Sequence, residues 1–250
     1  HCVVPLKRRY IGVQPKITLA ILSIGVSPFL MQLANSVVQG LFNINLIRYG
    51  GDLAVGAMGI IMSVTFIVIT CFIALNMASQ PLVGYNYGAG NFARVKETLR
   101  LVIIAATLIG VAAWAIIHAV PGVIISAFIT GNAELVALGV EGMHLFLLML
   151  PVIGFQVVAG NYFQSTGKAS TAVLLTLLRQ VIVLIPLLFI LPPLLGLKGV
   201  WLAAPVADTA AAIVCGSLLV VEWKKLNRSI AAGVVAGNAV RASSLPDTGD

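Results

Sequence analysis

Charged residues are scarce in this sequence of 250 residues, since Asp, Glu, Lys and Arg together make up only 9% of it. A soluble globular domain carries about 25% charged residues, which cover the surface that water contacts. Hydrophobic residues reach 60%, whereas soluble domains contain about 45–50% apolar residues. We therefore exclude an ordinary soluble enzyme and a disordered chain. The composition indicates an integral membrane protein built of helices.

Acidic residues and cysteines are also few. The sequence has 8 Asp and Glu against 15 Lys and Arg, and its net charge of +7 comes from this shortage of acids. Without dense basic clusters, nucleic acid is not an expected partner. The three cysteines, Cys2, Cys71 and Cys215, show no CxxC spacing, which argues against a zinc site. No catalytic or metal-binding motif is present, so we expect neither an enzyme nor a cofactor.

Long apolar runs dominate what is present, and a helix needs about 20 such residues to cross a membrane. Six stretches qualify: Ile17–Ile47, Leu53–Ser79, Leu99–Val120, Leu135–Gly160, Thr171–Leu191 and Gly199–Val221. Short segments with turn residues separate them. We expect an all-α membrane domain over residues 17–221. Residues 1–16 would form a cytoplasmic linker, and the small, polar residues of 222–250 would form a disordered cytoplasmic tail.

Basic residues are distributed unevenly between the predicted loops. If the N-terminus is cytoplasmic, twelve Lys and Arg lie on the cytoplasmic side, and only Arg48 and Lys198 lie on the other. Positive charge is enriched in cytoplasmic loops. The pattern therefore predicts a multi-pass protein of the plasma membrane with both termini in the cytoplasm.

The first predicted span carries a polar face. Its members recur at helical spacing and fall within roughly 100° of arc. They are Gln32, Asn35, Ser36, Gln39 and Asn43. Two interpretations remain open: the wall of a polar cavity, or amides that hydrogen-bond neighbouring helices. A stripe of nearly three turns favours the cavity, and neutral amides suit ligands of varied shape.

Arg179 and Asp208 are the deepest charges of the predicted spans. Their depths differ by roughly 7 Å, which an Arg side chain can cover, and the two spans follow each other in the chain. One interpretation is a buried ion pair that fixes helix packing. The other is that Asp208 exchanges a proton or cation during transport.

The segment after the second span reads QPLVGYNYGAGN over Gln80–Asn91. Pro81 and Gly84 predict the end of the helix at the cytoplasmic surface, and Gly90 allows a tight turn. We expect a small folded connector. Its predicted members are Gln80, Pro81, Gly84, Tyr85, Asn86 and Gly88.

This connector resembles the signature of the multidrug and toxic compound extrusion (MATE) transporters, in their MepA-like branch. Further motifs resemble the family in the same order, over about residues 15–225. They are Pro28–Ala34, Tyr49–Ala54, Ala57–Ile61, Phe163–Lys168, Leu178–Gln180, Ile185–Leu187 and Pro205–Asp208. The match covers only the C-terminal half of the family's pattern.

The resemblance implies one six-helix lobe of a twelve-helix transporter whose lobes rock around a central cleft. Its expected partners are an N-terminal six-helix lobe, amphipathic and often cationic substrates, and membrane lipid. The stripe would line the cleft, with Gln156 as a candidate partner, and Gln80–Asn91 would brace the cytoplasmic gate.

NorM-like members carry coupling acids in C-lobe helices. Few such acids occur here, so the coupling ion, H⁺ or Na⁺, is expected to bind mainly in the N-terminal lobe.

Three alternatives to a drug antiporter stay open at this point. One is a lipid-linked oligosaccharide flippase of the same superfamily, which a basic cleft would favour over a neutral one. Another is a non-transporting membrane remnant or interaction module. A third is a homodimer of two such lobes, which requires self-complementary cleft faces.

Overall fold

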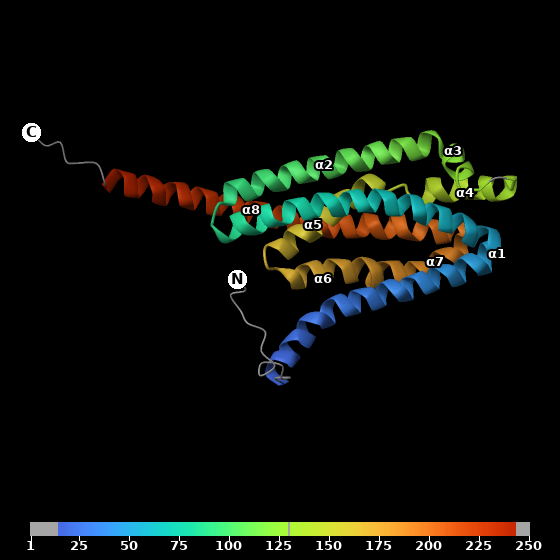
Figure 1. Ribbon diagram of the computed structural model, residues 1–250, viewed down its shortest axis with the longest axis horizontal. Coiled ribbons are helices and arrows are strands. Elements are labelled where there is room, and N and C mark those ends of the chain that lie inside the picture. The colour runs from blue at the N-terminus through green and yellow to red at the C-terminus, as the bar shows by residue number, and fades with distance from the viewer. Residues whose placement is uncertain (1–14, 130, 244–250) are drawn as a thin grey trace, which may run out of the picture.

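The computed structural model describes residues 15–129 and 131–243, and these form an elongated bundle of helices that run roughly along its long axis (Figure 1). The bundle consists of the α-helices α1 (Pro15–Gly88), α2 (Phe92–Ala119), α3 (Pro121–Ser126), α4 (Ala133–Phe146), α5 (Leu150–Ser165), α6 (Ala169–Leu177), α7 (Ile185–Leu195) and α8 (Leu197–Ser243), with a π-helix, η2 (Leu178–Leu184), between α6 and α7.

Within the described residues, four helical stretches are long and apolar enough to cross a membrane: Phe29–Gly88, Phe92–Ala119, Ser170–Leu195 and Leu197–Ala231. The bent pair of α4 and α5 qualifies as a fifth crossing. The first stretch consists of two helices that meet at a kink, and in Figure 1 α1 turns back on itself there. Counting it twice gives the six predicted crossings, so the chain is an all-α, multi-pass membrane protein.

The reversal within α1 depends on Gly51. Its backbone has φ 65° and ψ −165°, a conformation that is essentially restricted to glycine. The preceding Gly50 is constrained by space instead, because a Cβ there would lie 2.8 Å from the Leu197 side chain. Two adjacent glycines thus let the chain turn tightly beside the start of α8.

The fourth predicted span, Leu135–Gly160, is not one straight helix. It is divided into α4 and α5, which meet at an angle of 49°. Pro151 is the second residue of α5, and proline is favoured in the first turn of a helix but not in its interior. The break at Leu147–Met149 therefore places Pro151 where a helix accommodates proline without losing a hydrogen bond.

The prediction that Pro81 and Gly84 end the second span is wrong. The helix α1 continues through both residues to Gly88, and the turn follows at Ala89 and Gly90. Gly90 has φ 73°, so the left-handed residue that closes the turn lies six residues after Gly84. An interior proline removes one backbone hydrogen bond, which this helix tolerates.

The C-terminal helix is longer than predicted. The structure continues α8 to Ser243, across much of the segment 222–250 that we expected to be disordered. Alanine is frequent there and has the highest helix propensity, so the sequence extends an existing helix without the cost of nucleation. Residues 244–250 and most of the predicted linker 1–16 lie outside the described residues.

Small residues let the central helices pack closely. A Cβ on Gly154 of α5 would lie 3.0 Å from the Phe72 ring and 2.9 Å from the Ala106 carbonyl oxygen. Gly110 of α2 meets the Pro151 backbone in the same way. Such contacts draw α1, α2 and α5 together, as helix pairs in membranes require. The resulting core includes the fully buried Trp201 of α8.

Candidate substrate cavity and ion pair

A cavity of about 700 Å³ lies between α1, α5, α6, η2 and α8. Its apolar walls include Met31, Val157, Leu175 and Cys215. Its polar lining is mostly neutral and consists of Asn76, Gln156, Asn161, Gln164, Thr176 and Arg179. A large, mainly apolar space with a few convergent polar groups is the usual form of a small-molecule site.

Two asparagines form the neutral wall of this cavity where α1 meets α5. The Asn76 side chain donates to the Val157 carbonyl oxygen at 3.4 Å, and the Asn161 side chain donates to the Asn76 carbonyl oxygen at 3.3 Å. The Asn76 Oδ1 atom is buried and has no hydrogen-bond partner among the described residues. An unpaired buried acceptor is costly, so this oxygen is suited to accept a hydrogen bond from a ligand or water.

Arg179 and Asp208 form an ion pair beside the cavity. Arg179 Nε lies 2.5 Å from Asp208 Oδ1, and the Asp208 side chain is only 2% exposed. The Gln156 side chain donates to the Asp208 carbonyl oxygen at 2.9 Å. These contacts join α5, η2 and α8 at one point, and they place Gln156 and Arg179 in the same cavity.

The polar stripe of the first span lies outside this cavity. Gln32, Asn35, Ser36, Gln39 and Asn43 are all exposed. A neighbouring face of the helix, with Ala34, Val38 and Phe42, is buried in the lobe. Asn35 connects the stripe to the ion-pair region, because its side-chain oxygen accepts a hydrogen bond from Gln180 of η2. The structure therefore brings Gln156 to the cavity and leaves the stripe on the outer surface of the lobe.

The predicted connector residues fall on the end of α1 and on the turn that follows. Tyr85 is exposed, whereas Asn86 is buried and donates to the Leu82 carbonyl oxygen at 2.8 Å. The Asn86 carbonyl oxygen accepts from the Asn91 backbone at 2.8 Å, which closes the turn. A Cβ on Gly84 would lie 3.4 Å from the Ser165 carbonyl oxygen. Gln80, Pro81 and Gly88 are exposed.

Sequence reasoning missed four polar cavity residues, Asn76, Asn161, Gln164 and Thr176. They lie on three different helices, α1, α5 and α6, so together they form no stripe that the sequence alone reveals. The available signal was the series Gln156, Asn161 and Gln164, whose spacing of five and three residues keeps all three near one helix face. Asn76 joins that face only through the packing of α1 on α5.

The fold and cavity define the class: a multi-pass helical membrane protein with a mainly apolar cavity, lined by a few polar groups, between its helices. The profile of the MatE family matches residues 28–190, which is more than half of the chain. The chain therefore belongs to the MatE family.

Three similar proteins illustrate this relationship. The multidrug export protein MepA of Staphylococcus haemolyticus is 27% identical over 192 residues, covering 77% of this chain and 42% of MepA. The solved structure of the MATE multidrug transporter DinF-BH is 35% identical, with a TM-score of 0.70 over 83% of this chain and 46% of that chain.

The third similar protein is a multidrug resistance MATE family transporter of the MOP superfamily in an inward-facing conformation. It gives a TM-score of 0.78 at 21% identity, over 89% of this chain and 51% of its own. Because this identity is low, it supports the fold alone. The chain spans about half the length of the relatives that it matches.

Proposed function

We propose that the chain is the C-terminal lobe of a cation-coupled multidrug antiporter that exports amphipathic, often cationic compounds. An N-terminal lobe supplies the other wall of the cleft, and rocking of the two lobes alternates access between the sides of the membrane. The substrate contacts the stripe and reaches the cavity beside Gln156. The names of the related multidrug export protein MepA and multidrug transporter DinF-BH support this class of substrate.

The exposed stripe is the observation that carries the proposal. Five polar side chains, Gln32, Asn35, Ser36, Gln39 and Asn43, lie on the outer face of a membrane helix. Polar groups that face hydrocarbon are costly and usually face a partner or a water-filled cavity. A cleft shared with a second lobe removes that cost and gives the stripe a ligand to contact.

The chemistry of the cavity supports a neutral or cationic ligand. Of the polar residues that line it, Arg179 is the charged one, and its charge is balanced by Asp208. Amide oxygens such as that of Asn76 accept hydrogen bonds from ammonium or amide groups. The apolar walls around Met31 and Leu175 accommodate the hydrophobic part of an amphipathic molecule.

Coupling to H⁺ or Na⁺ is proposed to depend mainly on the N-terminal lobe, with Asp208 as the candidate group within this chain. Replacing Asp208 with Asn removes the charge and keeps the shape. If Asp208 exchanges the coupling ion, D208N transport loses its dependence on pH or sodium. If D208N transport keeps its dependence on pH and sodium and only the expression level falls, the Arg179–Asp208 pair serves helix packing and not ion coupling.

The reading frame that encodes the chain offers the first test. We expect an in-frame segment of six further membrane helices before residue 1, and a stop codon directly upstream would favour a non-transporting remnant. The protein encoded by the whole frame is then reconstituted in liposomes, where we expect ethidium export against its gradient when a pH or sodium gradient is applied.

Residues 1–250 alone serve as the matched control in the same liposomes. We expect no export, because a single lobe has one wall of the cleft. Ethidium export by residues 1–250 would contradict the two-lobe proposal. A cysteine introduced at Asn35 separates the remaining alternative, since efficient disulfide crosslinking between two copies would indicate a homodimer with facing stripes.

A further inference from the structure

A second pocket lies at the end of the bundle opposite the Gly51 turn. It has a volume of about 360 Å³, roughly ten times the share of one water molecule in the liquid. Three parts of the chain form it: the turn between α1 and α2, the turn between α5 and α6, and α8. The residues that the argument uses are Tyr87, Phe92, Lys168, Lys225, Leu226 and Arg228.

Positive charge dominates the walls of this pocket. Lys168, Lys225 and Arg228 line it together with one carboxylate, Glu222, so the lining carries a net charge of +2. The same end of the bundle also holds Arg94, Lys96 and Arg100, with Glu97 as the acid among them. An excess of positive over negative side chains between membrane helices favours the binding of an anionic ligand at the membrane surface.

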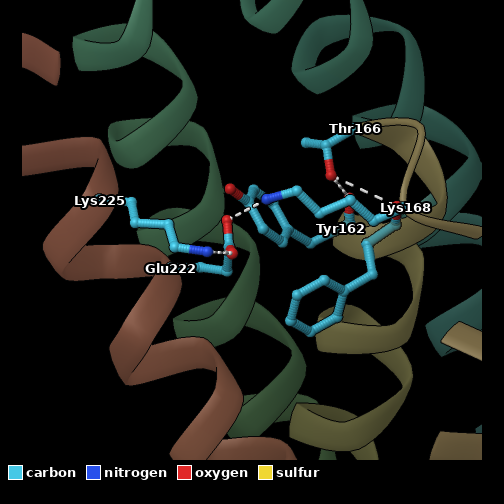
Figure 2. Close-up of polar contacts among 6 residues, drawn as sticks. Tyr162, Thr166, Lys168, Glu222 and Lys225 are labelled. Carbon is cyan, nitrogen blue, oxygen red and sulfur yellow. Dashed lines mark hydrogen bonds and ion pairs between the residues drawn. The ribbon is translucent and has the colours of Figure 1, made fainter. Parts of the chain in front are cut away.

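Glu222 positions two of the cations. Figure 2 shows Lys168 from the α5–α6 turn and Lys225 from α8 meeting at its carboxylate. Lys225 Nζ lies 3.1 Å from Glu222 Oε1. The Glu222 side chain is 9% exposed, whereas that of Lys225 is 62% exposed. Each ammonium has three N–H donors, so donors remain after the contact with Glu222.

Arg228 completes the cationic rim. It follows Lys225 by three residues on α8, a spacing that places the two side chains on one face of the helix. Arg228 is exposed and makes no ion pair within the described residues. Its planar guanidinium can donate two parallel hydrogen bonds to a phosphate.

Apolar and aromatic groups form the rest of the pocket. The Tyr87 and Phe92 rings pack edge to face at 5.7 Å, and Leu226 of α8 lies in the same lining. Tyrosine and basic side chains together are typical of the depth at which lipid headgroups lie. A membrane lipid presents this combination of a phosphate and an apolar glycerol ester, whereas a free phosphate presents the charge alone.

We propose that this pocket binds the phosphate headgroup of an anionic membrane phospholipid, such as phosphatidylglycerol. Lys225 and Arg228 hold the phosphate, Glu222 fixes the Lys168 and Lys225 ammonium groups, and the Tyr87, Phe92 and Leu226 side chains contact the glycerol region. The bound lipid links α8 to the turn that follows α1. This proposal concerns a lipid site apart from the substrate cavity and stands whether or not the chain transports drugs.

Native mass spectrometry of the delipidated full chain in detergent provides the test. Dioleoylphosphatidylglycerol and dioleoylphosphatidylcholine are titrated separately, and the dissociation constant for the first bound lipid is measured. We expect tighter binding of phosphatidylglycerol. Replacing one basic contact, as in Arg228→Gln, is expected to weaken its binding about five-fold, and Lys225→Gln is expected to weaken it similarly.

Lys224→Gln is the matched control, because Lys224 is exposed on the same helix but does not line the pocket. We expect its affinity for phosphatidylglycerol to remain within two-fold of the original, about the precision of the measurement. Because Lys225 also pairs with Glu222, thermal melting of each variant checks folding. Arg228→Gln keeps the test decisive if Lys225→Gln is unstable.

Three results would overturn the proposal. The first is equal loss of affinity in Lys224→Gln and Arg228→Gln, which indicates general surface charge. The second is equal binding of phosphatidylcholine and phosphatidylglycerol. The third is displacement of the lipid by sn-glycerol 3-phosphate at the same concentration as the lipid, which would indicate a site for a soluble phosphate compound.

Discussion

At the scale of single residues, the contact between Gly142 and Trp201 is one of the tightest in the bundle. A Cβ on Gly142 would lie 2.8 Å from the indole ring of Trp201, and Trp201 is fully buried. The indole leaves no room for a side chain on α4 at this position. A glycine is required here for space and not for an unusual backbone angle.

We therefore expect Gly142→Ala to destabilise the lobe by about 1–3 kcal/mol, because overpacking forces the ring or helix to move. Thermal melting in detergent measures this. Gly59→Ala is the control, since a Cβ at Gly59 meets nothing within 4 Å and alanine favours helix. Equal melting temperatures for the two variants would show that α4 and α8 separate easily.

The Arg179–Asp208 pair makes a second prediction at this scale. In Arg179→Gln the buried Asp208 carboxylate loses its partner, and breaking a buried pair costs about 3–5 kcal/mol. Lys198→Gln removes the exposed pair of Lys198 with Glu141, whose side chains are 64% and 42% exposed. That change is expected to cost under about 1 kcal/mol.

Melting temperatures of the two variants, compared with the unaltered chain, check this difference. If Arg179→Gln lowers the melting temperature as little as Lys198→Gln does, water reaches Asp208 and screens its charge. The pair would then contribute little to the packing of η2 on α8.

At the scale of elements, Gly51 determines how α1 divides into two crossings. Alanine at Gly51 would have to adopt φ near 65° with ψ near −165°, which costs about 1–3 kcal/mol. We expect Gly51→Ala to lower the melting temperature and to favour a less complete reversal. Gly40→Ala, in the same helix and with open space around its Cβ, is expected to be neutral or slightly stabilising.

Protease accessibility of the Tyr49–Leu53 turn, measured beside melting, distinguishes local opening from general unfolding. If Gly51→Ala melts like Gly40→Ala and resists protease equally, the turn does not require this backbone conformation.

Hydropathy and turn residues were sufficient to predict the six crossings, because twenty apolar residues form a helix in lipid whatever their order. Helix ends were less predictable. Pro81 and Gly84 lie inside α1, because flanking residues keep the helix continuous through one missing hydrogen bond. Pro151, in contrast, lies in the first turn of a new helix, α5. The local sequence does not distinguish a proline inside a helix from one at a helix start, because tertiary packing decides whether the helix continues.

The candidate site was predictable only in part, for a related reason. Periodicity within one helix identifies a stripe such as Gln39 and Asn43. It cannot identify a cavity assembled from single residues on different helices, such as Asn76 and Thr176. The positions of Arg179 and Asp208 were predictable because charges are rare in the spans and the two helices are consecutive.

At the scale of the whole molecule, the five polar side chains of the stripe are exposed on the outside of the lobe, where we propose that they face a second lobe. Gln39→Leu with Asn43→Leu replaces two exposed amides by apolar groups. In residues 1–250 we expect equal or higher stability in lipid, because polar groups facing hydrocarbon are removed. In the protein encoded by the whole reading frame, we expect ethidium export to fall by about ten-fold or more, since each lost hydrogen bond weakens binding.

Ile44→Leu, at an exposed apolar position of the same helix, controls for general effects of substitution. Melting and efflux are measured for both variants. Lower stability of the double variant in residues 1–250 would indicate that the amides stabilise the lobe itself and do not face a cleft.

The π-helix η2 has a consequence for the tolerance of deletions. A π-turn contains one residue more than the α-turn that it replaces. Removing one residue from the exposed part of η2, such as Ile182, would let the segment close into an ordinary α-helix, with α6 and α7 each keeping its orientation. The same deletion in α7, for example of Phe189, would rotate everything that follows by about 100°. The span formed by α6, η2 and α7 can therefore lose one residue within η2 while the side chains of α6 and α7 keep facing the same neighbours.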